Sequence, residues 1–467
     1  MLDAQAIVHR FLEKKLQVHP DVVRYLSEQG DSALIDELVA SLPGETLVVS
    51  PGHIPGLALS RDGARFLPDP ACEVIKGKSG SVGNVESVQD YIHYFRDRHS
   101  RLGEMIRGRL AVIPIEALLK NSRFHQEAVG ILGMISEVKT TTKGHRMLDL
   151  EDSTGHVPIL FNKDRPGFSD AETLLPDEVI GVRGTLSNDG RLFFADQLFR
   201  PDIPISHAPF LSERPGKAVL ISDIHAGSTT FLAEAWHRFG DWLSGSDVSY
   251  MLIAGDIVDG IGVYPGQEHE LTVPNIYEQY DMVGKLLGEL PSHIRIIISP
   301  GNHDVVRGAE PQPAIPEQFR GSFPKNCTFV ENPALVSLQG VQVLMYHGRS
   351  IDDMISLIPG ASYQNPGPMM DGMLQRRHLA SVYGKRTPIA ADKQDRLLID
   401  TVPEVLHTGH IHVTGITQYR GVLGINAGAW QSQTAFQKQM NLNPTPAQAI
   451  VLDLQTLVPE VLDFSAA

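Results

Sequence analysis

The chain has 467 residues, of which 42% are hydrophobic and 20% charged, and its formal net charge is −15. This length predicts roughly two to three globular domains. The excess of carboxylates repels polyanions, so nucleic acid would be attracted only through bound cations, a basic patch or a partner subunit. No apolar run approaches the ~18 residues of a membrane span, and we expect a cytoplasmic protein. Two cysteines, Cys72 and Cys327, exclude a disulfide framework and a thiolate zinc site.

The first part of the chain predicts helices separated by a linker. Residues 1–40 carry apolar side chains at helical spacing and predict a small helical module. Residues 41–83 are rich in Pro, Gly and Ser without sustained periodicity, which is typical of a flexible linker. A helical connector is expected over residues 84–123.

Residues 124–205 predict a small β-barrel. Apolar and polar residues alternate in short segments, and Asn188-Asp189-Gly190 indicates a hairpin turn between two of them. About five strands interrupted by glycines favour an OB-fold over another small β-domain.

Residues 215–467 predict the largest domain, of α/β type. Its continuous apolar runs, such as "YMLIA" and "IRIIIS", are typical of strands that helices cover on both faces. Five runs end in residues that bind metals: "ISDIHAGS", "AGDIVDG", "SPGNHD", "YHG" and "HTGHIHVTG". Because sites in layered α/β domains form beyond the carboxyl ends of strands, the five loops are expected to share one cleft.

The donors in these loops indicate the kind of metal. Imidazole, carboxylate and amide oxygen without cysteine suit divalent ions, with Mn²⁺ as the first expectation and Mg²⁺, Zn²⁺ or Fe²⁺ as alternatives. Each motif alone could be an ordinary turn. Together they offer too many ligands for one ion, so we expect two ions ~3.5–4 Å apart, which can clamp the attacking and leaving oxygens of a phosphoryl displacement.

This ordered set resembles the calcineurin-like metallophosphoesterase superfamily, whose fold is a two-sheet β-sandwich flanked by helices. The resemblance implies that Asp256 bridges two metal ions and that His303 acts as general acid on the leaving oxygen. The remaining ligands that it implies are Asp223, His225 and His412 for the first ion, and Asn302, His347 and His410 for the second. His407, further back in its strand, is expected to pack in the core.

The order of the domains resembles the small-subunit family of archaeal DNA polymerase D. The local matches are "GNVESVQDYIHYFRDRHSRLGEMIRGR", "RRHLASVYGKRTPIA" and "AGAWQSQTAFQKQMNLNPTP". The resemblance implies a 3′→5′ proofreading exonuclease subunit in DNA replication, which acts on DNA 3′ ends. It also implies a complex, heterodimeric or larger, with a separate large polymerising subunit, and a sliding clamp is a further candidate partner.

Two alternatives remain open. A non-catalytic polymerase scaffold, as in the related eukaryotic B subunits that have lost ligands, would gain nothing from a complete set of clustered carboxylates and histidines. A stand-alone phosphatase or cyclic phosphodiesterase would not need residues 1–200.

Candidate DNA contacts lie ahead of the last histidines. The alternative to DNA contacts is a solvated helix face that contacts a partner. The side chains expected to contact the DNA backbone are Arg376, Arg377, Lys385 and Arg386. For Trp430, Phe436 and Tyr383, core packing is favoured over base stacking. The barrel lacks a dense mixture of aromatic and basic residues, so we expect it to form an interface rather than a single-strand binding site.

Overall fold

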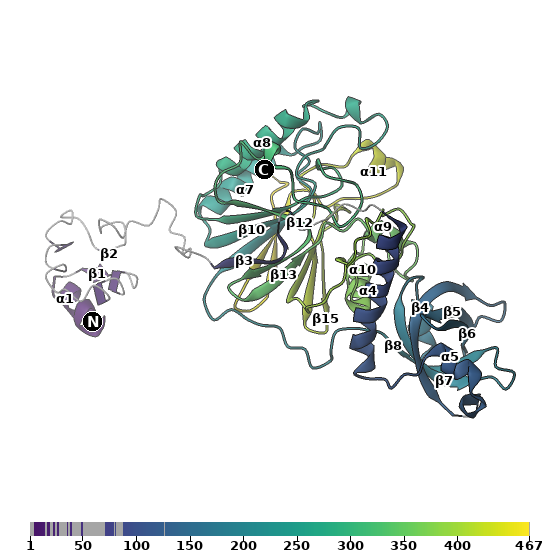
Figure 1. Cartoon of the computed structure of the whole chain (residues 1–467). Coiled ribbons are helices and arrows are strands. Elements are labelled where there is room, and N and C mark those ends of the chain that lie inside the picture. Colours follow the sequence, from purple (N-terminus) through teal and green to yellow (C-terminus); the bar gives the residue numbers. More distant parts are fainter. Residues whose placement is uncertain are drawn as a thin grey trace. The chain divides into compact units, whose positions relative to one another are not determined.

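The computed structural model describes residues 71–466 except 79, 81–86 and 126. Of the first 70 residues it describes 4–14, 16–18, 22–23, 26–27, 35, 38–39 and 48–49. The chain divides into two compact units, residues 1–66 with 241–247, and residues 67–240 with 248–467 (Figure 1). None of the described helices has the length and the apolar character needed to cross a membrane.

The first unit contains a helix and a short parallel strand pair. Helix α1 (Ala4–Glu13) has Ile7 and Phe11 on one face, where both are buried in a small apolar cluster. Strand β1 (Gln17–Val18) pairs with β2 (Val48–Val49). Strand β2 falls within the segment predicted as linker, and most of the remainder of that segment lies outside the described residues.

Strand β3 (Cys72–Lys78) corrects the predicted linker at its other end. It pairs antiparallel with β12 (Cys327–Leu338), and Val74 packs against the core of the large sheet. A flexible linker over residues 41–83 therefore cannot include residues 72–78. The pairing partner lies about 250 residues later in the chain, and local periodicity carries no signal for such a contact.

The second unit is built around one mixed sheet of 11 strands. Its path is β15-β16-β14-β13-β12-β11-β10-β9-β17-β18, with β3 beside β12. The strands not yet located are β9 (Lys217–Ile221), β10 (Val248–Ala254), β11 (Arg295–Ser299), β13 (Val341–Met345), β14 (Val405–Thr408), β15 (Gly415–Tyr419), β16 (Val422–Asn426), β17 (Gln448–Asp453) and β18 (Pro459–Asp463).

Strand β12 joins two halves that the sequence predicted as separate sheets. Its first residues run parallel to β11, and residues 334–338 pair antiparallel with β13. The two halves that the resemblance implied are therefore present, but they share one long strand, and the sheet curls from one half into the other (Figure 1).

Helices cover the sheet on both sides (Figure 1). Helices α7 (Ala233–Ser244) and α8 (Ile276–Gly288) lie on one side, and α9 (Ile351–Ile355) and α10 (Gly367–Arg376) lie on the other, near α4 (Val88–Arg107). The short helices of the sheet domain are η3 (Gln267–His269), η4 (Glu317–Phe319) and α11 (Ala435–Gln439). Each half of the sheet has helices on its outer face, while its inner face packs against the other half in an apolar core of strand residues such as Leu252, Val343 and Ile425. The strands are therefore buried on both faces, as the continuous apolar runs predicted, but helices cover only one of the two faces.

A closed five-stranded barrel precedes the sheet domain, in the order β4-β5-β6-β8-β7. Its strands are β4 (Val129–Thr140), β5 (Arg146–Asp152), β6 (Gly155–Phe161), β7 (Val179–Leu186) and β8 (Phe193–Phe199), and its helices are α5 (Ile115–Lys120), η2 (Ser122–His125) and α6 (Phe168–Glu172). Alternate side chains such as Ile131, Leu148 and Phe193 fill the interior. The predicted hairpin at residues 188–190 joins β7 to β8.

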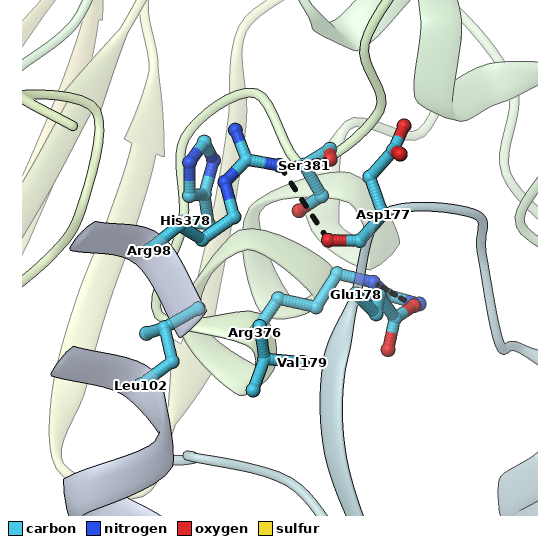
Figure 2. A pocket seen from close by; sticks show the side chains of 8 residues that line it. All are labelled: Arg98, Leu102, Asp177, Glu178, Val179, Arg376, His378 and Ser381. Atoms are coloured by element: carbon cyan, nitrogen blue, oxygen red, sulfur yellow. Dashed lines mark hydrogen bonds and ion pairs between the residues drawn. The ribbon is translucent and has the colours of Figure 1, made fainter. Parts of the chain in front are cut away.

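Helix α4 is fixed to the sheet domain by a buried ion pair between Arg98 and Asp395. Figure 2 shows Arg98 beside His378 and Ser381 of the sheet domain. The guanidinium of Arg98 donates to Asp395 at 2.7 Å and to the carbonyl of Ser381 at 2.8 Å. His378 contacts the same carboxylate through Nε2 at 2.7 Å. Burial alone would raise the pKa of Asp395, but His378 and Arg98 hold the pKa well below its usual range. The pair therefore joins α4 to the segment that follows α10.

We expect Arg98→Ala to destabilise the full chain by about 3 kcal/mol or more, because it leaves the Asp395 carboxylate buried without its cation. Lys120→Ala is the matched control, since it removes a cation from an exposed pair with Glu116 and should cost ~0–1 kcal/mol. Urea unfolding followed by circular dichroism measures both. Equal losses of unfolding free energy would show that the buried pair is not a major constraint.

Candidate metal centre

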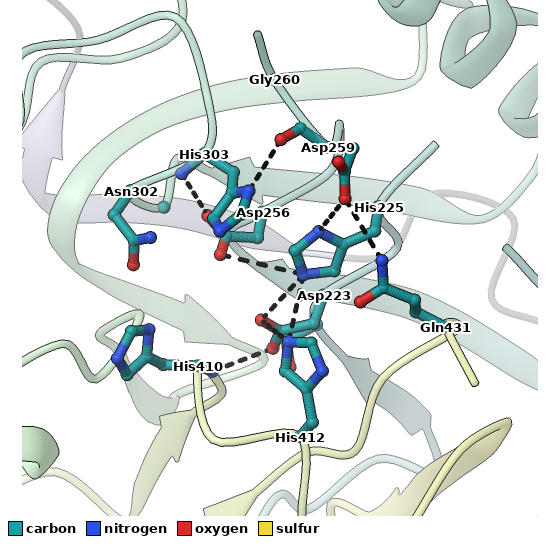
Figure 3. A network of polar contacts seen from close by, with 12 residues as sticks. Asp223, His225, Asp256, Asp259, Gly260, Asn302, His303, His410, His412 and Gln431 are labelled. Carbon is teal, nitrogen blue, oxygen red and sulfur yellow. Dashed lines mark hydrogen bonds and ion pairs between the residues drawn. The ribbon is translucent and has the colours of Figure 1, made fainter. Parts of the chain in front are cut away.

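The five predicted loops meet at one edge of the sheet. Asp223 follows β9, Asp256 follows β10, and His303 follows β11. Since β9, β10 and β11 run parallel, their carboxyl ends lie together, and β13 and β14 bring His347 and the histidines of residues 410–412 to the same cleft. Figure 3 shows side chains from these loops converging on a common space.

Many of the candidate ligands have an unusual backbone conformation. Thirteen of the described residues other than glycine have a positive φ, and five of them are Asp223, His225, Asp256, His410 and His412, with φ of 50–72°. Such conformations cost roughly 1–3 kcal/mol each and persist where the surrounding structure fixes them. Their concentration at this cleft indicates a functional site.

The first group of side chains surrounds the carboxylate of Asp223. The Nε2 atoms of His225 and His412 lie 3.1 Å apart, and they lie 3.7 and 3.4 Å from Oδ1 of Asp223. That oxygen is buried and accepts no hydrogen bond. Burial would raise the pKa of Asp223, but its contacts with the two histidines hold the pKa well below its usual range. Two facing imidazole nitrogens beside a buried carboxylate fit a divalent cation among them.

The second group surrounds the carboxylate of Asp256. Nε2 of His347 lies 3.1 Å from Oδ2 of Asp256 and 3.1 Å from Oδ1 of Asn302. Asp256, His347 and His410 each offer a ligand atom within 4.8 Å of the others. Oδ2 of Asp256 also lies 4.0 Å from Nε2 of His225 in the first group, so this carboxylate is placed between the two groups.

Each imidazole of the two groups has its other nitrogen in contact with the protein. Nδ1 of His225 contacts Asp259 at 3.1 Å, Nδ1 of His347 contacts the carbonyl of Ala254 at 2.8 Å, and Nδ1 of His412 contacts Gln437 at 2.9 Å. For His410, Nε2 contacts Asp352 at 3.2 Å. Metal-binding histidines usually donate from the second ring nitrogen to an oxygen, as His225 and His347 can here, because this bond fixes the orientation of the ring. Gln437 instead directs its amide nitrogen at Nδ1 of His412.

Sequence reasoning missed these outer contacts. Asp259 lies in the quoted "AGDIVDG" motif and Gln437 in the quoted "AGAWQSQTAFQKQMNLNPTP" match, but neither received a role. Asp352 lies in a helix outside every quoted motif. Asp304, quoted with the ligand residues, instead accepts hydrogen bonds from the backbone of Gly301 and from Tyr280. Burial raises the pKa of Asp304 to about 7.

His303 lies beside both groups. Its backbone N–H donates to Oδ1 of Asp256 at 2.8 Å, and its ring packs edge-on against His225 with centroids 4.8 Å apart. Nδ1 lies 2.7 Å from the carbonyl of Asp259, which leaves Nε2 for chemistry in the cleft. Burial lowers the pKa of His303.

Two of the predicted DNA contacts do not fit the structure. Arg376 is buried and its Nε donates to Glu178 of the barrel at 2.6 Å, while Nε of Arg377 donates to the carbonyl of Ile399 at 2.7 Å. Arg376 therefore joins the barrel to the sheet domain, and Arg377 binds carbonyls within the sheet domain, contacts that a helical pattern cannot reveal. Lys385 and Arg386 are exposed.

The predicted aromatic core is right for one residue of three. Trp430 is buried against Trp236 and Phe239 of α7. Phe436 is 59% exposed, and Tyr383 is 39% exposed. Neither of these two belongs to the core. His407 is fully buried as expected, and burial lowers its pKa to about 3.

Residues 216–421 match the family model described as calcineurin-like phosphoesterase. The sheet domain is therefore a calcineurin-like metallophosphoesterase domain, a class that binds divalent metal ions, as the sequence predicted. The chain is 42% identical over 421 residues to the DNA polymerase II small subunit of Halobacterium salinarum, covering 89% of this chain and 81% of the relative.

A second relative, the DNA polymerase II small subunit of Archaeoglobus fulgidus, is 40% identical over an alignment of 483 positions, gaps included, and 96% of each chain is covered. That of Methanothermobacter thermautotrophicus is 42% identical over 410 residues, covering 84% of this chain and 83% of the relative. The chain belongs to the family of DNA polymerase II small subunits, the polymerase D small subunits that its sequence resembles.

We expect Gly301→Ala to reduce metal binding, because a methyl group there would overlap Oδ1 of Asp256 and crowd His347. Gly308→Ala is the matched control, since its methyl group would meet only the end of the Arg349 side chain, at 3.6 Å. The measurement is the number of Mn²⁺ ions bound per full-length chain in equilibrium dialysis. Equal binding by the two variants would contradict the close packing around Asp256.

Proposed function

We propose that the chain is the proofreading 3′→5′ exonuclease subunit of a replicative DNA polymerase, hydrolysing phosphodiester bonds at DNA 3′ ends. The observation that carries the proposal is the complete donor set: two groups of imidazoles, carboxylates and an amide, with Asp256 between them. A scaffold subunit has no use for a buried cluster of this kind, whose convergent carboxylates cost free energy unless cations neutralise them.

In this proposal Asp256 bridges two divalent ions. The first ion would also be held by Asp223, His225 and His412, and the second by Asn302, His347 and His410. When bound, such ions supply positive charge that stabilises a phosphoryl group in the transition state. Mn²⁺ is the first candidate, and Mg²⁺, Zn²⁺ or Fe²⁺ suit the same donors.

His303 would protonate the leaving 3′ oxygen. Its Nδ1 is engaged with the carbonyl of Asp259, so in the imidazolium form the second proton is on Nε2, the atom left for the cleft. Because burial lowers the pKa of His303, its imidazolium is a stronger acid than an exposed one and gives up this proton more readily.

Lys385 and Arg386 are the remaining candidates for contacts with the DNA backbone, since both are exposed. We infer that the barrel is an OB-fold, on the basis of its five closed strands, and that it serves as an interface. The relatives are named as small subunits of a DNA polymerase, which supports a large polymerising subunit as the partner of this chain.

The purified chain should shorten a 5′-labelled single-stranded or 3′-mispaired DNA only when a divalent metal is present, because the acidic protein needs cations to hold the phosphate. Removal of metal with EDTA should abolish the activity, and Mn²⁺ should restore it. Circular single-stranded DNA is the control for endonuclease cleavage. Full activity in the chelated protein would overturn the two-metal site.

Substitutions at His303 and Asp256 should separate chemistry from metal binding. His303→Ala should lower kcat by ~10²–10⁴-fold while the chain retains its Mn²⁺, because general acids typically contribute that much. Asp256→Asn should instead lower the Mn²⁺ content, since this carboxylate contacts both groups. Equal loss of metal in the two variants would contradict the roles assigned.

Deletion of residues 1–66 should spare both nuclease activity and binding of the large subunit, because the barrel and the sheet domain belong to the second unit. A deletion that continues to residue 80 removes β3 and its pairing with β12, and should destabilise the sheet. Pull-down with the large subunit and the nuclease assay test both truncations. Loss of pull-down with retained nuclease activity in the shorter deletion would place the docking element in residues 1–66.

A further inference from the structure

Two adjacent carboxylates on α9 contact different parts of the candidate site. Oδ2 of Asp352 lies 3.2 Å from Nε2 of His410, and Oδ1 of Asp352 accepts a hydrogen bond from Tyr363 at 2.9 Å. Asp353 accepts hydrogen bonds from the backbone N–H groups of Arg386 at 2.8 Å and Thr387 at 3.0 Å. One turn of helix α9 therefore contacts both a candidate metal ligand, His410, and the loop that carries Lys385 and Arg386, called the basic loop below.

The carboxylate of Asp352 is held in one orientation. Its two oxygens have different partners, and its side chain is 25% exposed while that of His410 is 15% exposed. The backbone of His410 is fixed as well, since its N–H donates to Oδ2 of Asp223 at 2.9 Å. With Nε2 occupied by Asp352, Nδ1 is the nitrogen left to His410 for binding a metal beside Asp256.

We propose that Asp352 is a positioning residue that orients His410 toward the second metal ion, and that Asp353 fixes the Lys385–Arg386 loop at a set distance from it. The inference rests on the ligand assignment in the proposed function. Asp352 touches neither substrate nor metal in this assignment; it acts through the imidazole. A carboxylate on the far nitrogen of a ligand histidine fixes the ring and increases its basicity.

The first ion should not depend on Asp352. Its imidazoles have their own outer partners, Asp259 for His225 and Gln437 for His412. Loss of Asp352 should therefore lower the affinity for the second ion and leave the affinity for the first ion unchanged. General damage to the fold would lower the affinity for both ions.

The test is titration of the full-length chain with Mn²⁺, followed by equilibrium dialysis and by the EPR signal of a spin-coupled ion pair. The wild-type chain should bind two ions. Asp352→Ala should bind the first ion normally and the second about 10–100-fold more weakly, with loss of the coupled signal. Asp352→Asn keeps the shape of the side chain and should show a smaller loss at the same ion. It decides the question if the alanine variant does not fold.

Two further variants serve as controls. Asp371→Ala removes another half-buried carboxylate, which accepts a hydrogen bond from Thr417 at 3.0 Å, and should bind two ions like the wild type. Asp353→Asn should also bind two ions, but it should raise the KM for a 5′-labelled oligothymidylate severalfold, because the loop loses its backbone contacts.

The possible results are distinguishable. The inference would be overturned if the Asp352 variants bound both ions normally, or if they bound both ions equally weakly. It would also be overturned if the wild-type chain bound fewer than two ions. If the wild type binds two ions and the Asp352 variants lose the second, the inference on Asp352 holds even where no exonuclease activity is found. In that case only the proposed function fails. An unchanged KM in Asp353→Asn would overturn the role given to Asp353.

Discussion

The structure depends on the burial of Asp223 and Asp256 in one cleft together with four imidazoles. Two buried carboxylates repel each other and have lost their hydration, so the arrangement is stable only with positive charge among them. The strained backbone at the candidate ligands and the absence of a side chain at Gly301 both follow from this crowding. The parallel strands provide the rigid frame that maintains it.

The outer contacts extend the cleft into the rest of the domain. Asp259, Gln437 and Asp352 come from three separate segments, and each contacts the ring of one candidate ligand. Helix α9 also fixes the basic loop through Asp353. The geometry of the candidate site is therefore set in part by packing outside the ligand motifs, as expected for a domain that binds divalent metal ions.

The barrel and α4 are fixed to the sheet domain by buried charges. Arg98 pairs with Asp395, and Arg376 pairs with Glu178. Separating the partners of such a pair leaves a buried charge without its counter-ion, which costs free energy. These contacts therefore favour one relative placement of barrel and sheet domain within the second unit. Arg376, which the sequence suggested as a DNA contact, is therefore engaged in the interface between barrel and sheet domain.

The sequence by itself determined the strands and the ligand motifs. Continuous apolar runs and the residues at their ends are local patterns, and parallel strands bring such ends together in any sheet of this type. Tertiary structure alone decided the pairing of β3 with β12, the single curled sheet, the burial of Arg376 and the role of Asp352. The physical reason is that these features are contacts between segments far apart in the chain, and neither composition nor periodicity specifies which distant segment a residue will meet.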